Sequence, residues 1–378
     1  MTLSIAFFIS DLTVGGAQIQ TIALVRRLKA NGHDVRLIVH HAHHAEGLVD
    51  ADLLAITTFL GGFRMRNPLG WLRAWRAIRR HKPEFVVAVN TVPTIVAALG
   101  KTLGRFPGRL MSVFHTTAVV GGRENVEFKL FRLAVRAVNC LVYVSANQRR
   151  HWEARKLSPQ RSAVILNGVD VTHFAREHVL MGNAEAKRAL GLDADDYVVG
   201  ISAALRPEKN HEQLVDAIVA LRRAGVPATA LIVGDGSQRS AITDRAHTLG
   251  VTSHVVLAGE QKDVRPFLAA MDVGVLCSTA VETLSLAALE SMSMGVPMVL
   301  SDIGGASEIV TTGVNGYLFP VGQTDVLVAR LLELGDRAVR IRMSGAAIET
   351  ARSHFSAGRM VSAYEHLFDE LQCGSVSS

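Results

Sequence analysis

The sequence predicts an α/β protein made of two doubly wound parallel-sheet domains, and three observations lead to this prediction. Short apolar runs rich in β-branched residues alternate with longer amphipathic segments along the chain, which is the pattern of parallel strands connected by helices. The alternation lapses near His173–Ala184 and then starts again. With 378 residues, the chain also exceeds the length at which a single hydrophobic core usually keeps growing.

The first half of the chain contains six runs that we expect to be strands, joined by right-handed crossovers. The first run is interpreted as a buried strand and not as a signal peptide, because no basic segment leads it and no small-residue cleavage pattern follows. The amphipathic segment Ala17–Ala30 is expected to be a helix. The six runs are Leu3–Ile9, Asp34–Val39, Phe85–Val89, Leu110–Phe114, Cys140–Ser145 and Ala163–Leu166.

The second half repeats the pattern with five strand-like runs. Helical segments such as His211–Ala224 and Ser237–Leu249 separate them, and Ala357–Leu371 is expected to be a helix near the end. We therefore expect domains at residues 1–175 and 176–355, followed by a C-terminal helix and tail at 356–378. The five runs are Tyr197–Ala203, Ala228–Val233, His254–Leu257, Val273–Cys277 and Met298–Leu300.

Composition and charge restrict the class of protein. Hydrophobic residues make up 49% of the chain, which excludes general disorder. The net charge of +6 suits an anionic ligand or an anionic membrane surface, whereas no ladder of aromatic and basic side chains indicates nucleic acid. Three widely spaced cysteines indicate a reduced, cytoplasmic protein. The longest apolar stretches, such as Phe85–Gly100, are too short and too interrupted to span a membrane.

Loops that follow strands are the candidate sites, because ligands of open parallel sheets bind beyond the carboxyl ends of the strands. In the first half these loops hold Gly15 and Gly16, which open a helix, and His115. The glycines would let the backbone approach an anion at the helix N-terminus, or they form an ordinary turn. They do not match the nicotinamide or flavin fingerprint. His115 would hydrogen-bond a sugar hydroxyl, or it is a structural histidine.

In the second half, Arg206 and Lys209 flank the turn after the first strand. Two cations at such a turn suit a pyrophosphate, and the alternative is a solvated loop. Gly234 follows the next strand within a Gly-Asp-Gly turn. It permits close backbone approach to a ligand, or it serves the turn alone.

The segment between Glu282 and Glu290 is the most informative one. A helix is expected to start near Thr283–Ser285, and a helix N-terminus attracts phosphate. The two glutamates are eight residues apart, which is about 2.2 helical turns and places them on nearly one face. Buried carboxylates need partners, which sugar hydroxyls would supply, unless Glu290 pairs within the protein. The amides expected to face the phosphate are those of Leu284, Ser285 and Leu286.

The order of these pieces resembles that of the family-four retaining glycosyltransferases, which have the GT-B architecture of two Rossmann-like domains facing a central cleft. The resemblance covers residues 3 to about 370. Its most specific part is ETLSLAALE at 282–290, followed by GVP at 295–297. The other pieces are GGAQ at 15–18, FH at 114–115, VSAN at 144–147, NGVD at 167–170, RPEKN at 206–210, VGDG at 233–236, GEQKDV at 259–264 and GG…E at 304–308.

The resemblance implies a retaining, metal-independent hexosyltransferase that takes a UDP- or GDP-sugar as donor. It also implies a C-terminal helix that crosses back to the N-terminal domain, which would bind the acceptor. Gly16 would let the backbone approach the donor, and His115 would contact the transferring sugar. Lys209 with Arg206 would neutralise the leaving diphosphate. The other implied donor contacts are Glu282 to the sugar hydroxyls, Glu290 to the ribose, and Gln261 and Val264 beside the base.

The chain departs from the family pattern at two places. Ala204 stands where the family has an arginine, and Arg206, two residues later, is interpreted as its substitute. Thr283 and Leu284 stand where the family has a glycine and an aromatic residue. The identity of the donor sugar is therefore not carried over.

A basic amphipathic segment, Trp71–Lys82, favours contact with an anionic membrane, or it is a surface helix packed on its own sheet. On this ground a lipid-linked glycan is the expected acceptor, and the protein is expected at the inner face of the plasma membrane. A nucleotide-sugar epimerase and a non-catalytic nucleotide-sugar binding protein are the alternative functions.

Overall fold

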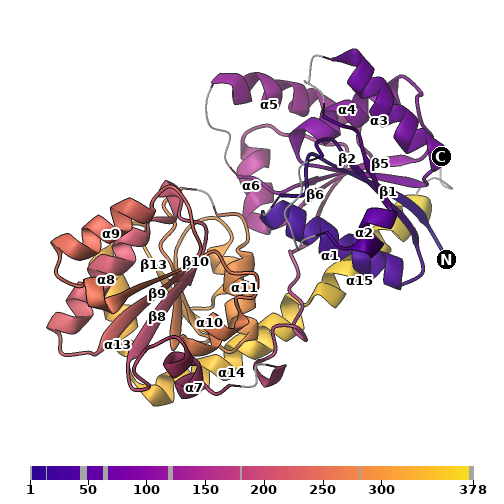
Figure 1. Cartoon of the computed structure of the whole chain (residues 1–378). Coiled ribbons are helices and arrows are strands. Elements are labelled where there is room, and N and C mark those ends of the chain that lie inside the picture. Colours follow the sequence, from indigo (N-terminus) through magenta and orange to yellow (C-terminus); the bar gives the residue numbers. More distant parts are fainter. Residues whose placement is uncertain are drawn as a thin grey trace. The chain divides into compact units, whose positions relative to one another are not determined.

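The computed structural model shows two compact units, Met1–Asn167 together with Ala357–Ser378, and Gly168–Ser356. Figure 1 shows the elements of each unit, and each unit is described by itself. The structure describes residues 2–13, 15–42, 49–62, 67–117, 122–178, 181–280 and 282–373. The last helix, α15 (Ala357–Cys373), belongs to the first unit, as the predicted crossover requires.

The first unit is built on a parallel sheet, which within the described residues has seven strands in the order β3-β2-β1-β4-β5-β6-β7. The six predicted runs are all strands of this sheet. The additional strand, β3, has only three residues and no apolar run. The strands are β1 (Ser4–Ile9), β2 (Asp34–Val39), β3 (Thr57–Phe59), β4 (Phe85–Val89), β5 (Arg109–Phe114), β6 (Cys140–Tyr143) and β7 (Ser162–Val164).

Helices cover both faces of this sheet, because successive side chains of a strand point to opposite faces. Phe7 of β1 lies in one buried cluster with α1 (Gly16–Ala30) and α15. Phe8 lies in the other cluster, against helices on the opposite face (Figure 1). Those helices are α3 (Pro68–Arg80), α4 (Thr91–Thr102), α5 (Gly122–Ala134), the 3-10 turn η1 (Val135–Ala137) and α6 (Ala146–Ala154); the short α2 (Ala51–Ala55) lies on the α1 side.

Aromatic packing fixes α15 in the first unit. The ring of Phe368 lies 4.7 Å from that of Phe85, measured between centroids. His33 and Glu365 add a polar contact of 3.1 Å between Nε2 and Oε1. The last helix is therefore part of the core of the first unit, although the more than 180 residues of the second unit lie between this helix and the rest of the first unit in sequence.

The second unit contains a parallel sheet of six strands among the described residues, in the order β10-β9-β8-β11-β12-β13. The five predicted runs are strands, and β13 is additional. The strands are β8 (Tyr197–Ser202), β9 (Ala228–Val233), β10 (Val255–Gly259), β11 (Val273–Leu276), β12 (Met298–Ser301) and β13 (Gly316–Phe319).

Helices lie on both faces of the second sheet as well (Figure 1). One face carries α8 (His211–Arg223), α9 (Arg239–Thr248) and α13 (Thr324–Glu333). The other carries α7 (Asn183–Ala189), α10 (Arg265–Ala270), α11 (Leu286–Ser293) and α14 (Arg337–His354). Short elements complete the unit: η2 (Arg176–His178), η3 (Pro207–Lys209), η4 (Thr252–His254) and α12 (Ala306–Ile309).

Candidate active site

An ion pair between Lys209 and Glu282 lies at the carboxyl edge of the second sheet. Lys209 Nζ donates to Glu282 Oε2 at 2.6 Å, and the Ser278 hydroxyl donates to the same oxygen at 2.8 Å. The side chains are only 20% and 12% exposed. Lys209 follows β8 and Glu282 follows β11, which are neighbours in the sheet. The fold thus brings together two predicted residues that are 73 positions apart.

Backbone contacts hold the two loops that carry this pair. The amide of Thr279 donates to the carbonyl of Glu208 at 2.9 Å. A side chain at Gly304, whose φ is +61°, would overlap the carbonyl oxygen of Glu282. Only glycine fits at such a positive φ with a backbone atom so close. Strand β11 lies between β8 and β12 in the sheet. Glu282, which follows β11, therefore has the loop after β8 on one side and the Gly-Gly turn after β12 on the other.

Arg206 and Lys209 differ in their surroundings although both flank the 3-10 turn η3. Lys209 is half-buried and paired, whereas Arg206 is exposed. Among the described residues, Arg206 forms no ion pair. Arg206 is therefore free to turn toward an anion, while Lys209 is already fixed beside Glu282.

Gly234 permits a close approach, but to the protein itself. Its φ is +137°, and a side chain there would overlap the carbonyl oxygen of Ala203. Gly236 packs in the same way against Leu205. The turn after β9 thus supports the loop that carries Arg206 and Lys209, and protein packing alone accounts for this glycine.

Gln261 and Val264 lie in the loop after β10, at the edge of the same sheet. Gln261 Nε2 donates to the carbonyl of Ala258 at 2.6 Å, and Val264 precedes α10. Strand order places the loops in the sequence Gln261, Gly234, Lys209, Glu282 along the carboxyl edge. The carboxyl edge therefore offers an extended row of contacts from Gln261 after β10 to the ion pair, which lies after the two central strands, β8 and β11.

Helix α11 begins at Leu286, slightly later than predicted. The hydroxyl of its N-cap, Ser285, accepts from the amide of Ala288. The first-turn amides that a ligand would meet are therefore those of Leu286 and Ala287. Leu284 and Ser285 are buried just before the helix.

Glu290 lies one turn into α11, and Glu282 precedes the helix. The spacing of 2.2 helical turns does not relate the two glutamates, because the segment from Glu282 to Ser285 is not helical. Burial raises the pKa of Glu290 to about 7. No ion pair involves Glu290 in the described ranges, which leaves its half-buried carboxyl available to a ligand.

The candidate residues of the first unit lie at the carboxyl edge of its sheet. Gly15 is the N-cap of α1, and Gly16 is the first helical residue. His115 follows β5, and its amide donates to Asn90 Oδ1 at 3.0 Å. Burial lowers the pKa of the His115 ring to about 4, so the imidazole is neutral at pH 7.

Sequence reasoning missed Asn90 and Ser278. Asn90 has a φ of +65° and follows β4, and an asparagine directly after an apolar run was the available signal. Ser278 directly follows the β11 run and donates to Glu282. Both residues are polar, and each stands where a strand meets its loop.

The basic segment forms α3, whose apolar side is already occupied. Trp75 and Ile78 are buried in the core of the first unit, and the arginines face solvent. Residues 63–66, which precede it, lie outside the described residues. None of the helices in the described ranges is both long enough and apolar enough to cross a membrane.

Comparison with known proteins decides the family. A family model described as Glycosyltransferase Family 4 matches residues 14–173, and one described as Glycosyl transferases group 1 matches residues 183–350. The chain belongs to the family-four glycosyltransferases. The first match ends after β7 and the second begins with α7. One family model therefore covers the first sheet of this family-four chain, and the other covers the second.

Solved and curated relatives agree with this assignment. The family-four chain superposes on Anabaena HepE, solved in complex with UDP, with a TM-score of 0.83 at 20% identity, over 97% of this chain and 100% of that one. This likeness shows the GT-B fold. A lipopolysaccharide core biosynthesis mannosyltransferase of Rhizobium meliloti, LpsB, is 29% identical over 54% of this chain and 63% of its own length.

A second curated relative is the Escherichia coli UDP-Gal:alpha-D-GlcNAc-diphosphoundecaprenol alpha-1,3-galactosyltransferase. It is 28% identical over 64% of this chain and 65% of its own length. The family-four chain thus matches somewhat less than two thirds of each of these two curated relatives.

Proposed function

We propose that the chain transfers a hexose or N-acetylhexosamine from a nucleoside-diphosphate sugar to an acceptor hydroxyl, with retention of anomeric configuration. The observation that carries this proposal is the Lys209–Glu282 pair beside the N-terminus of α11. A cation and free helix amides suit a diphosphate, and a carboxylate next to them suits sugar hydroxyls. The solved UDP complex of HepE and the nucleotide-sugar donor in the name of the Escherichia coli relative support the choice of donor.

The row of loops along the second sheet suggests how the donor lies. Gln261 and Val264 would border the base, and the half-buried carboxyl of Glu290 would accept from the ribose hydroxyls. Lys209, Arg206 and the first amides of α11 would hold the diphosphate. In the structure, Glu282 is paired with Lys209. A bound diphosphate would share the lysine and leave Glu282 free to hold the transferred sugar.

In the proposed reaction the acceptor oxygen bonds to the anomeric carbon on the face from which the diphosphate departs. The bond from that carbon to the phosphate oxygen breaks, and the acceptor proton passes to that oxygen. No side chain has to act as a strong base. The two cations and the helix amides stabilise the charge that grows on the departing oxygen, which is why we propose that no bound metal is needed.

The first unit supplies residues that we propose to act on the transferred sugar and the acceptor. The neutral ring of His115 would exchange hydrogen bonds with a sugar hydroxyl, and Gly16 would let the backbone approach the donor. The proposed acceptor is a lipid-linked glycan, as in the name of the Escherichia coli relative. The exposed arginines of α3 would then meet an anionic membrane at its cytoplasmic face.

Binding and product analysis test this function. In a thermal-shift panel of UDP, GDP, ADP and their sugars, one nucleotide series should raise the melting temperature, because a ligand that binds only the folded state stabilises it. NMR of the product formed by the selected donor should show the anomeric configuration of the donor. An inverted product, sugar epimerisation without acceptor, or binding without any transfer would each contradict the proposal.

The raised pKa of Glu290 predicts that donor affinity depends on pH. Glu290 loses its proton as the pH rises through about 7, and only the carboxylate accepts from two ribose hydroxyls. We expect the selected nucleotide sugar to bind roughly tenfold more tightly at pH 8 than at pH 6 by calorimetry. Glu290→Gln should remove this difference. A wild-type affinity that is constant between these pH values would contradict the ribose assignment.

A further inference from the structure

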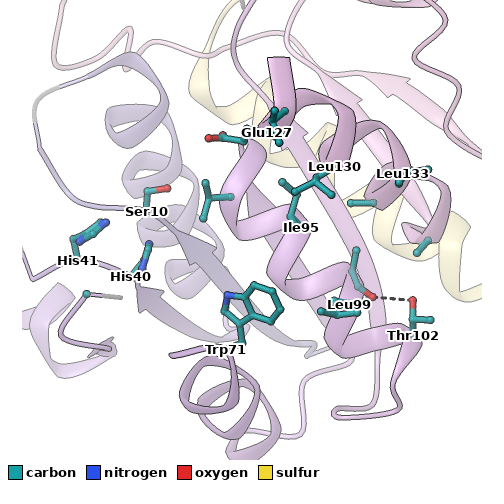
Figure 2. A pocket seen from close by; sticks show the side chains of 16 residues that line it. Ser10, His40, His41, Trp71, Ile95, Leu99, Thr102, Glu127, Leu130 and Leu133 are labelled. Atoms are coloured by element: carbon teal, nitrogen blue, oxygen red, sulfur yellow. Dashed lines mark hydrogen bonds between the residues drawn. The ribbon is translucent and has the colours of Figure 1, made fainter. Parts of the chain in front are cut away.

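An open groove of about 1470 Å³ lies on the face of the first unit that α3, α4 and α5 cover. Figure 2 shows it running between α3 on one side and α5 on the other, across α4. Its volume exceeds the 300–1,000 Å³ that is typical of sites for drug-sized ligands. Its apolar lining comes mainly from Trp71, Val92, Ile95, Leu99, Val126, Leu130 and Leu133.

Helix α5 carries two apolar faces, of which only one is used by the fold. Phe128 and Phe131 are buried in the core of the first unit. Val126, Leu130 and Leu133 line the groove and are 59%, 42% and 60% exposed. A surface helix needs one apolar stripe to cover its sheet, and a contiguous second stripe that faces solvent marks a binding surface.

The two ends of the groove differ in polarity (Figure 2). Ser10 and His40 stand at one end, directly after β1 and β2, and Leu133 stands at the other. Near the polar end, the hydroxyl of Thr91 donates to the carboxylate of Glu127 and joins the start of α4 to α5. The polar end therefore lies at the carboxyl edge of the sheet.

That edge is also where the catalytic candidates of the first unit stand. Asn90, which accepts from the His115 amide, directly precedes α4, and Val92 of α4 lines the groove. The groove thus leads from an exposed apolar end toward the loops after β1, β4 and β5. A molecule with a long apolar part and a polar reacting end matches this layout.

Basic residues accompany the apolar stripe of α5. At 3.6 residues per turn, Lys129 lies next to the stripe of Val126, Leu130 and Leu133, and Arg136 follows α5 in the 3-10 turn η1. Both cations are exposed. Lysine and arginine beside an apolar stripe are typical of helices that bind anionic lipids.

We propose that this groove binds the hydrocarbon chain of a lipid-linked acceptor, with the phosphate-bearing head toward the Ser10–His40 end. The inference rests on the proposed sugar transfer and adds the part of the acceptor that the first unit recognises. The apolar stripe of α5 and the facing side chains of α4 hold the chain. The carboxylate of Glu127, which lines the groove, is already engaged by the Thr91 hydroxyl. The exposed Lys129, which lies beside the stripe and outside the lining, adds the positive charge that would attract the anionic head.

Calorimetry with single-chain probes tests the groove without any catalytic step. The probes are farnesyl phosphate, geranyl phosphate and inorganic phosphate, each below its micelle concentration. Farnesyl phosphate should bind at least tenfold more tightly than geranyl phosphate, because every buried methylene adds to affinity. Inorganic phosphate should not compete with it. Equal affinity of the two isoprenyl phosphates would overturn the proposal.

Matched variants locate the binding. Leu130→Gln with Leu133→Gln should weaken farnesyl phosphate binding at least tenfold. Leu332→Gln with Ile341→Gln is the control, because these side chains of the second unit are exposed to nearly the same extent, 42% and 63%. A loss in the control as large as in the groove variant, or no loss in either, would overturn the assignment.

Two further measurements distinguish the lipid groove from a membrane-docking surface and from the donor site. The first is binding to phosphatidylglycerol vesicles. If the wild-type protein binds these vesicles, the groove variant does not, and farnesyl phosphate binds neither protein, then the surface docks on membranes and the proposal fails. The groove variant should keep the donor-induced thermal shift unchanged. A protein that binds farnesyl phosphate as expected but shows no donor response would contradict the proposed transfer and leave the groove assignment standing.

Discussion

Replacing Glu282 with alanine is expected to lower kcat for sugar transfer by about 10²–10³-fold while the fold is kept. Among the described residues, the Glu282 carboxylate is the only acceptor to which both Lys209 Nζ and the Ser278 hydroxyl donate. Without it, a bound sugar would lose the carboxylate that we propose to orient its hydroxyls. Steady-state kinetics with the selected donor measure the effect, and circular dichroism with a melting curve verifies the fold.

Glu208→Gln is the matched control for this variant. Glu208 neighbours Lys209 in the same loop, and its backbone carbonyl, which the substitution keeps, accepts from Thr279. The control removes one negative charge close to the site without touching the proposed sugar contact. Glu208 is half-buried and forms no ion pair in the described residues, so the rate of the control should stay within about twofold of wild type. Wild-type rates for purified Glu282→Ala would show that the sugar contact is assigned to the wrong residue.

The sequence predicted the layers of the fold because buried parallel strands are nearly continuous apolar runs. Each of the eleven predicted runs overlaps a strand of one of the two sheets. Strands β3 (Thr57–Phe59) and β13 (Gly316–Phe319) escaped prediction since three or four residues with a polar or glycine start make no run. Their positions at the sheet edges depend on pairing with a neighbour, which a local pattern does not contain.

The candidate site was predictable as a set of residues but not as an arrangement. Lys209 and Glu282 meet because β8 and β11 are adjacent, and strand order is not encoded in the order of apolar runs. The helix start at Leu286 was displaced because the hydroxyl of Ser285 caps the chain there. Gly304 is required by the backbone of Glu282, a contact that is visible only once both loops are in place.

Two features lay beyond the motifs altogether. The amphipathic pattern of α3 left two interpretations open, contact with a membrane or packing on its own sheet, and the structure shows Trp75 and Ile78 in the core. The apolar stripe that the fold leaves exposed belongs instead to α5, whose sequence GRENVEFKLFRLA mixes charged residues with two apolar faces and shows no single apolar side. Periodicity shows that a helix has an apolar side, whereas only the packed structure shows which side remains uncovered.

Replacing Lys209 with alanine is expected to weaken binding of the selected nucleoside diphosphate by about 10–100-fold and to lower kcat by about 10²-fold. Two causes act together. The diphosphate loses a cation that is already fixed in place, and Glu282 keeps its negative charge without its 2.6 Å partner. An unpaired carboxylate in a sheltered site then repels the diphosphate. Calorimetry of the nucleoside diphosphate and steady-state kinetics measure the two effects.

A double-mutant cycle separates these causes. In Lys209→Ala with Glu282→Ala, the uncompensated charge is gone, so the double variant should bind the diphosphate more tightly than Lys209→Ala alone, a non-additivity expected of residues in contact. Arg206→Ala should weaken binding less, because this exposed side chain has to be ordered when the anion arrives. In the part of the second unit that the structure describes, no other half-buried cation is paired with Glu282. If Lys209→Ala binds the nucleoside diphosphate as tightly as wild type, the proposal that Lys209 holds the diphosphate is therefore wrong.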